Sequence, residues 1–208
     1  MISKSKIFNL ALQALFINKR IVNADTDSST EAFVLRTQYD LVYIQALSEL
    51  DLDSTSQTKT LELLTTSPNQ KWRYAYRYPN DIALLRRIDN CQVTDDIDST
   101  IKHRVELFSY NGSTTKVVMT NENNSTIEYI SIDVPEDTLS VEAARYIACR
   151  LAEECVSLIV GEKSQSVMKT LKPKILEALI AARRKDGIET QVHESDWKLS
   201  SFVKARMS

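Results

Sequence analysis

Apolar residues near the beginning of the chain recur at intervals of three and four positions. Over residues 5–17 they are Ile7, Leu10, Ala11, Ala14 and Leu15. This spacing predicts an amphipathic helix. After a polar stretch, Ser28 and Glu31 form a capping-box pattern, which predicts the start of a second helix. That helix is expected to end near Leu50, where the sequence becomes polar.

The middle of the chain changes from a helical period to a period of two. In residues 71–78, Lys-Trp-Arg-Tyr-Ala-Tyr-Arg-Tyr, the aromatic residues form one face of a predicted strand and the basic residues the other. Asn111-Gly112 separates two further alternating runs and predicts a hairpin. A last strand is expected over residues 127–132. Residues 58–134 are therefore predicted to form a small antiparallel sheet.

Helical spacing returns after Pro135. Residues from Ala143 to Ile159 carry a broad apolar face, and Gly161 is a suitable C-cap. Another helix is predicted from Ser164 to Gly187, with Pro173 either kinking it or marking its true start. The residues that follow show no sustained period and indicate an extended tail.

These elements predict an α+β fold in which a four-helix bundle carries an inserted β-sheet. The bundle, made of two helical hairpins, is expected to comprise residues 1–57 and 135–189. The inserted small antiparallel β-sheet comprises residues 58–134. Residues 190–208 form an extended C-terminal docking tail.

Composition excludes several classes of function. The 208 residues are 43% hydrophobic and 26% charged, which is typical of a folded globular chain. A net charge of −2 argues against a nucleic-acid coat or a polybasic membrane binder. The 3 glycines are too far apart for a P-loop or a dinucleotide fingerprint, and 2 histidines supply little for a metal site. We therefore expect no cofactor, no metal and no membrane partner.

Two groups of residues are candidates for catalysis. Asp95, Asp96 and Asp98 precede His103 and match a metal or acid–base site, but they also match a solvated turn before a strand. A small hydrolase built on them would show metal-dependent activity. Cys149 and Cys155 lie on a small-residue helix face, where cysteine usually packs as a small hydrophobe. A Cys–His dyad is the alternative. The chain is expected not to be an enzyme.

Two basic segments are candidates for binding nucleic acid. In residues 71–78, Arg73, Arg77 and Tyr74 match a single-strand-binding platform, although a core strand explains the same alternation. A nucleic-acid-binding module is thus the alternative function. Cations at the end of the last helix, Arg183, Arg184 and Lys185, complement the helix dipole. They also suit a surface that faces an acidic partner or a DNA channel.

The tail contains apolar anchors with flanking charges. Trp197 and Phe202 lie close to Lys204 and Arg206. This composition is typical of a segment that orders on a partner, with an aromatic hot spot and a charged rim. The alternative is that Trp197 and Phe202 fold back on the chain's own helices.

Taken together, the segments resemble the head-to-tail adaptor proteins of short-tailed bacteriophages, of the tail tubular protein A type. The family's opening helix, Leu-Ala-Leu-x-Ala-Leu, corresponds to residues 10–15. Its motif Trp-x-Tyr-Ala-Tyr-x-x-Pro-x-Asp, the most specific segment, corresponds to residues 72–81. A Pro-Glu-Asp turn at 135–137 and the helix end Ala-Arg-Arg-Lys-Asp-Gly at 182–187 follow in the same order.

The resemblance implies a structural, non-enzymatic virion protein. Its copies would form a ring of roughly a dozen subunits through head-to-tail contacts. The ring would link the portal protein to the tail tube or nozzle protein and extend the DNA channel. Genomic DNA would pass through without sequence-specific contacts. The protein would lie in the tail or neck of the virion after assembly in the cytoplasm of the bacterial host.

The resemblance also assigns roles to three groups of residues. The first docks on the portal or on a neighbouring subunit: Trp197, Phe202, Lys204 and Arg206. The second faces the channel or an acidic partner: Arg183, Arg184 and Lys185. The third forms the core of the family motif: Trp72, Tyr74, Tyr76, Pro79 and Asp81.

Overall fold

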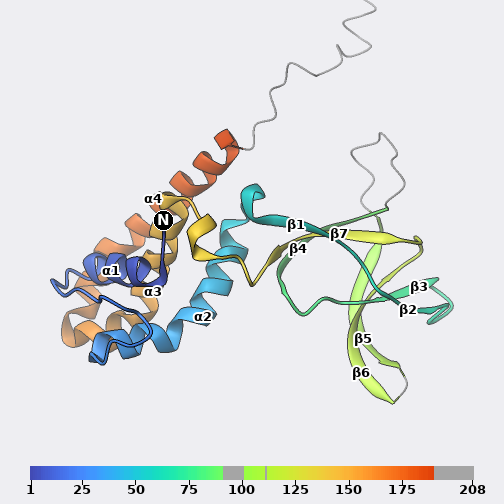
Figure 1. Ribbon diagram of the computed structural model, residues 1–208, viewed down its shortest axis with the longest axis horizontal. Coiled ribbons are helices and arrows are strands. Elements are labelled where there is room, and N and C mark those ends of the chain that lie inside the picture. Colours follow the sequence, from blue (N-terminus) through green and yellow to red (C-terminus); the bar gives the residue numbers. More distant parts are fainter. Residues whose placement is uncertain (91–100, 111, 190–208) are drawn as a thin grey trace, which may run out of the picture.

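The computed structural model describes residues 1–90, 101–110 and 112–189. Figure 1 shows the helices gathered in one part of the molecule and the strands in another. The α-helices are α1 (Lys4–Ala14), α2 (Thr30–Leu50), α3 (Val141–Val160) and α4 (Ser164–Glu189). The short 3-10 helices are η1 (Asp53–Thr55), η2 (Glu136–Thr138) and η3 (Gly161–Lys163). The structure is α+β.

Serine side chains start three of the α-helices. The hydroxyl of Ser3 accepts from the Lys6 amide at the start of α1, and that of Ser140 accepts from the Ala143 amide at the start of α3. Each bond satisfies an amide that has no partner within the helix. In α2 the capping residue is Ser29, one position later than the capping-box pattern indicates.

The predicted four-helix bundle is wrong. A bundle encloses its core between its helices, whereas here α3 is itself the centre, and α1, α2 and α4 each pack against it. The buried residues of α3 include Ala143, Ala144, Tyr146, Ile147, Cys149, Leu151, Ala152 and Cys155. They lie around most of the helix rather than along one stripe, as expected of a helix packed on several sides. Small side chains allow the other helices to approach it.

The β part consists of two antiparallel sheets. One has the strand order β1-β7-β4, and the other has the order β2-β3-β6-β5. The strands are β1 (Ser56–Thr60), β2 (Leu63–Thr66), β3 (Tyr74–Arg77), β4 (Ile82–Asn90), β5 (His103–Tyr110), β6 (Ser113–Thr120) and β7 (Ser125–Ser131). The single small sheet predicted for this region is therefore also wrong.

Strand β4 shows why the sequence predicts too few strands. Its pairing with β7 shifts register between Ile82 and Leu84 and again between Leu85 and Arg87. Each irregularity changes the face on which the next side chain lies, so the strand has no simple alternation in its sequence. Because the alternation of apolar and polar residues does not reveal β4, it does not indicate a three-stranded sheet around β7.

The two sheets share a buried cluster, and the helices contact one of them. Ile127 and Tyr129 of β7 pack with Tyr76 of β3 and Val118 of β6. Ile130, which follows Tyr129 on the other face of β7, belongs to the core of the helical part. The three-stranded sheet therefore lies between the helices and the four-stranded sheet at this point.

Candidate functional site

The aromatic motif is split between two faces of the four-stranded sheet. Tyr76 is fully buried on the face that meets the other sheet, and Tyr74 packs beside it. Trp72 lies before β3 begins and packs instead with Val117 and Met119 on the opposite face. The expectation that all three aromatics share one face is therefore wrong, because regular alternation starts only at Tyr74.

Asp81, at the end of the motif, contacts residues of the three-stranded sheet. The Tyr129 hydroxyl donates to Asp81 at 2.8 Å, and the ammonium group of Lys59 lies 3.6 Å from the same carboxylate. Partial burial raises the pKa of Asp81, but these contacts outweigh it and lower the pKa below its ordinary value. Pro79, which precedes Asp81 by two residues, is half-buried. Asp81 therefore has a structural partner.

Arg73 and Arg77 do not form one surface with Tyr74. Arg77 is on the opposite face from Tyr74, since successive residues of a strand alternate. Arg77 also forms an ion pair with Glu62 at 3.4 Å. Arg73 lies before the strand, where its backbone amide donates to the Asn121 side chain at 3.0 Å. The strand thus does not present Tyr74, Arg73 and Arg77 as one platform.

The cations at the end of α4 have different surroundings. Arg183 donates to the carbonyl of Glu49 at 2.7 Å and to that of Leu50 at 3.3 Å, and so caps α2. Lys185 pairs with Glu189 at 2.8 Å on the helix surface, and Arg184 is exposed. All three cations are exposed, and Arg183 and Lys185 also have partners within the chain.

A buried acid next to these cations was missed by the sequence analysis. The carboxylate of Asp186 accepts from the backbone amides of Asp53 at 2.7 Å and Ser54 at 3.0 Å. These amides begin η1 and have no partner within that helix. Asp186 therefore fixes α4 to the connection between α2 and β1. Its position within a basic run gives no sign of this distant contact.

An arginine completes the junction between the helical and β parts. Arg86 of β4 donates to Asp51 at 2.7 Å, to Asp53 at 2.6 Å and to Glu128 of β7 at 3.2 Å. Burial opposes the charge of Arg86, but the hydrogen bonds to these carboxylates outweigh it and raise its pKa. The junction thus holds charges from the C-cap of α2 and from η1, β4 and β7 in one cluster.

A second ionic cluster joins α2 to α3. Glu49 accepts from the Tyr146 hydroxyl at 2.5 Å and from the Gln45 amide at 2.9 Å, and it pairs with Arg150 at 3.1 Å. Partial burial favours the neutral acid, but the bonds to the carboxylate outweigh it. The pKa of Glu49 therefore lies below its ordinary value of 4.5.

The Glu49 cluster leads to a pH prediction. A lowered pKa stabilises the folded state above the unfolded-state pKa, and this contribution disappears as the pH falls through the folded-state pKa. The stability difference between the wild type and Glu49→Gln should thus be constant near neutral pH and shrink below about pH 4.5. Urea unfolding at several pH values measures it. A difference that grows on acidification would contradict the prediction.

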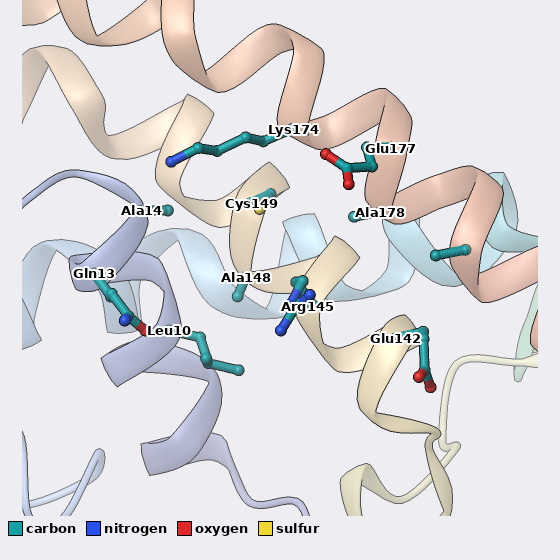
Figure 2. Close-up of a pocket in the computed structure, with 11 residues that line it drawn as sticks. Leu10, Gln13, Ala14, Glu142, Arg145, Ala148, Cys149, Lys174, Glu177 and Ala178 are labelled. Carbon is teal, nitrogen blue, oxygen red and sulfur yellow. The ribbon is translucent and has the colours of Figure 1, made fainter.

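A groove lies over α3 between α1 and α4. Its volume is about 370 Å³. Figure 2 shows α1 and α4 on either side of α3, with Arg145 and Cys149 between them. The floor consists of small or apolar side chains: Leu10, Ala14, Ala148, Cys149, Ala178 and Ala181. Charged residues of both signs line it: Glu142, Arg145, Lys174 and Glu177.

The two ends of the groove lie against different segments. The ammonium group of Lys174 lies 4.8 Å from the centre of the Phe16 ring, so α4 and the segment after α1 meet there. The opposite end, near Glu142 and Ala181, lies toward the C-terminus of α4. The alanines that form the floor come from three helices, so the sequence did not indicate a groove.

Two outer helix surfaces expose large apolar side chains. On α2, Phe33 is 64% exposed and Leu41 is 69% exposed. On α4, Leu176 is 59% exposed and Ile180 is 58% exposed. Within each pair the spacing of eight or four residues places both side chains on the same face. We call these the α2 face and the α4 face.

Several residues singled out in the sequence lie outside the described part of the chain. Asp95, Asp96 and Asp98 fall outside them, as do Trp197, Phe202, Lys204 and Arg206. The Nδ1 atom of His103 lies 3.0 Å from the carbonyl oxygen of Ile101.

The cysteines on α3 lie inside the protein. Cys149 and Cys155 are buried, and burial raises the pKa of both thiols, to about 12 for Cys155. In the part of the chain that is described, no three His, Cys, Asp or Glu side chains gather as a metal site.

Comparisons add no family to these observations. Within residues 1–90, 101–110 and 112–189, no helix has the length and apolar character needed to cross a membrane. A scan against models of protein families and a search of curated proteins both found no match to the chain.

Proposed function

We propose that the chain is a structural subunit that forms a ring, and that this ring is the head-to-tail adaptor of a short-tailed phage virion. The observation that carries the proposal is the pair of apolar surfaces, the α2 face and the α4 face. Both lie in the helical part, and α2 and α4 run along different sides of α3 in Figure 1. Large exposed apolar side chains on two such surfaces indicate protein contacts.

The two faces suit contact between copies of the chain. Asp40 is exposed beside Leu41 on the α2 face, whereas Lys172 and Arg184 are exposed near the α4 face. An acid thus lies beside one apolar pair and two cations lie near the other. If the α4 face of one copy packs on the α2 face of the next, each copy keeps one face free for a further copy. Such a heterologous contact repeats until it closes into a ring.

The sequence motifs support the remaining parts of the proposal. The order of motifs from residues 10–15 to residues 182–187 resembles that of the phage adaptors. We therefore propose that the ring links the portal protein to the tail tube or nozzle protein in the virion. Residues 190–208 would dock on the portal, and DNA would pass through the ring without sequence-specific contacts. No step of this function requires a catalytic residue.

Electron microscopy of the chain mixed with the portal protein from the same genome tests the proposal. We expect the free chain to be monomeric and to add a ring of roughly a dozen copies to the portal. Particles in which the portal carries no additional density would overturn the adaptor function. A stable ring without the portal would contradict the expected dependence on the partner.

Charge substitutions test whether the contact is heterologous. Phe33→Glu removes the α2 face and Leu176→Glu removes the α4 face. Each variant alone should fail to form the ring, because burying an unpaired charge opposes the contact. Together they retain one intact interface, so an equal mixture should form pairs but no rings. Pairs measured by native mass spectrometry in the presence of portal are the expected result.

A matched control separates the interface from general effects of charge. Leu158 of α3 is 65% exposed and lies on neither face. Leu158→Glu should therefore leave the ring intact. If Phe33→Glu prevents assembly whereas Leu176→Glu does not, then two α2 faces pack against each other and the heterologous interface is wrong.

A further inference from the structure

The four-stranded sheet exposes a leucine at each of its two edges. Its outer strands are β2 and β5, and within the described residues no further strand pairs with either of them. Leu63 of β2 is 45% exposed, and Leu107 of β5 is 73% exposed. Figure 1 shows the strands of this sheet away from the helices. A strand edge with an exposed apolar side chain is a typical site for pairing with another strand.

The edges of the other sheet carry features that oppose such pairing. Strand β1 exposes only polar side chains, including Lys59, and the pairing of β4 with β7 is irregular at two places. In contrast, β5 pairs with β6 without a shift from His103 to Tyr110. The irregularity in β2 begins after Leu63, which is opposite Tyr76. The four-stranded sheet therefore has the edges that suit a further strand.

The backbone of Leu63 points to the free edge of β2. In a strand, the N–H and C=O of one residue point to the same side, and those of the next residue point to the other side. The carbonyl of Glu62 accepts from the amide of Arg77 at 2.9 Å, and so points toward β3. The N–H and C=O of Leu63 therefore point away from β3.

The same argument places the backbone of Leu107 at the free edge of β5. The carbonyl of Lys116 in β6 accepts from the amide of Tyr78 at 3.1 Å, and so points toward the β3 side. Lys116 is opposite Leu107 in the β5–β6 pair. This pair is thus not hydrogen-bonded, and the N–H and C=O of Leu107 point away from β6.

The two leucine side chains lie on the same face of the sheet. Leu63 is opposite Tyr76, Tyr76 is opposite Val118, and Val118 is opposite Val105. Residues opposite each other in neighbouring strands share a face. Leu107 is two residues from Val105 and therefore lies on that face too. The opposite edges thus present matching side chains and matching backbone groups.

The directions of the strands identify the occupant as a second copy of the chain. Each of the three strand pairs in the sheet is antiparallel, so β5 runs opposite to β2. If two copies lie side by side in the same orientation, β5 of one meets β2 of the next as an antiparallel pair. Copies in a ring that is built from heterologous contacts have this relation.

We propose that β5 of each copy pairs with β2 of the next copy in the ring, with Leu107 opposite Leu63. The four-stranded sheets then join edge to edge from copy to copy. This inference rests on the ring proposed above and names a second contact within it. Because β2 has only 4 residues, the contact adds to the packing of the α2 and α4 faces and does not replace it.

Crosslinking of the ring on the portal tests this contact. Opposite residues of a strand pair have Cβ atoms about 4.5–5.5 Å apart, which a short bismaleimide can join as thiols. Leu63→Cys and Leu107→Cys are made in a Cys91→Ser background, in which the other cysteines are buried. The double variant should give covalent oligomers up to a complete ring. Neither single variant should crosslink, whereas an equal mixture of the two should give covalent pairs.

The outcomes separate the sheet contact from the ring itself. A ring that is seen by electron microscopy but gives no crosslink in the double variant would overturn the sheet contact and leave the proposed function in place. Covalent pairs from Leu107→Cys alone would show that two β5 edges pair, which also overturns it. A portal that carries no ring would overturn the proposed function and this contact together.

Amide hydrogen exchange tests the contact in the unaltered chain. The amides of Leu63 and Leu107 should exchange at least about tenfold more slowly in the portal-bound ring than in the free chain. Thr58 is the control. The amide of Leu61 donates to the carbonyl of Ser125, so by alternation the amide of Thr58 points to the outer edge of β1.

The exchange of Thr58 should be equally fast in the free chain and in the ring. Unchanged exchange at Leu63 and Leu107 in the ring would overturn the proposal. Equal slowing at Thr58, Leu63 and Leu107 would also overturn it, because a general stabilisation of the β part would then explain the result.

Discussion

Replacing Trp72 by alanine should lower the free energy of unfolding by about 3–5 kcal/mol, the usual cost of removing a buried aromatic side chain. Trp72 is only 8% exposed and covers Ala75, Val117 and Met119, which are fully buried beneath it. Without the indole ring these residues of β3 and β6 would face solvent. Urea unfolding monitored by circular dichroism measures the loss.

The control for Trp72 lies on a neighbouring strand. Leu107 of β5 is 73% exposed, so Leu107→Ala should change the free energy of unfolding by less than about 0.5 kcal/mol. Unchanged stability of Trp72→Ala, together with a loss of affinity for single-stranded DNA, would favour the nucleic-acid-binding alternative. The burial of Trp72 against Val117 and Met119 argues instead for a loss of stability.

Asp186→Ala should destabilise the protein by at least about 2 kcal/mol, because hydrogen bonds to charged groups contribute about 1.5–3 kcal/mol each. The substitution removes the acceptor for the amides of Asp53 and Ser54, which are 2.7 Å and 3.0 Å from its oxygens. Amide hydrogen exchange at these two residues should also become faster. Asp186→Asn keeps one acceptor oxygen and should cost less.

A nearby surface residue controls for the loss of negative charge. Glu189 pairs with Lys185 at 2.8 Å on the exposed side of α4. Glu189→Ala should cost no more than about 0.5 kcal/mol, as is usual for exposed pairs within a helix. If Asp186→Ala is equally mild, and exchange at Asp53 and Ser54 is unchanged, then Asp186 does not hold the junction.

The sequence predicts local features better than distant contacts. Serine caps and apolar spacing predict the α-helices to within a few residues, since both signals lie within one element. Trp72 shows that the sequence does not predict where a strand begins. It continues the alternation of Tyr74 and Tyr76, yet it lies before the strand, and no local pattern marks the point where regular pairing begins.

The candidate sites depend on contacts between distant segments. Asp186 meets the amides of Asp53 and Ser54 more than one hundred residues earlier in the chain. The groove combines Ala14, Ala148 and Ala181 from three helices, and alanine is common in any helix. The residues that line both features are ordinary in their local context. Only the packing around α3 brings them together.

The pairing of β1 with β7 bears on how such a protein can evolve. Ser56 of β1 is opposite Ile130 of β7, so the chain leaves the helices and returns to them at neighbouring positions. Insertions or deletions among the other strands therefore need not displace α2 or α3. Lineages can change the β part to suit a new partner while the spacing between helical parts is conserved. Selection can thus act on the two parts separately within a single polypeptide.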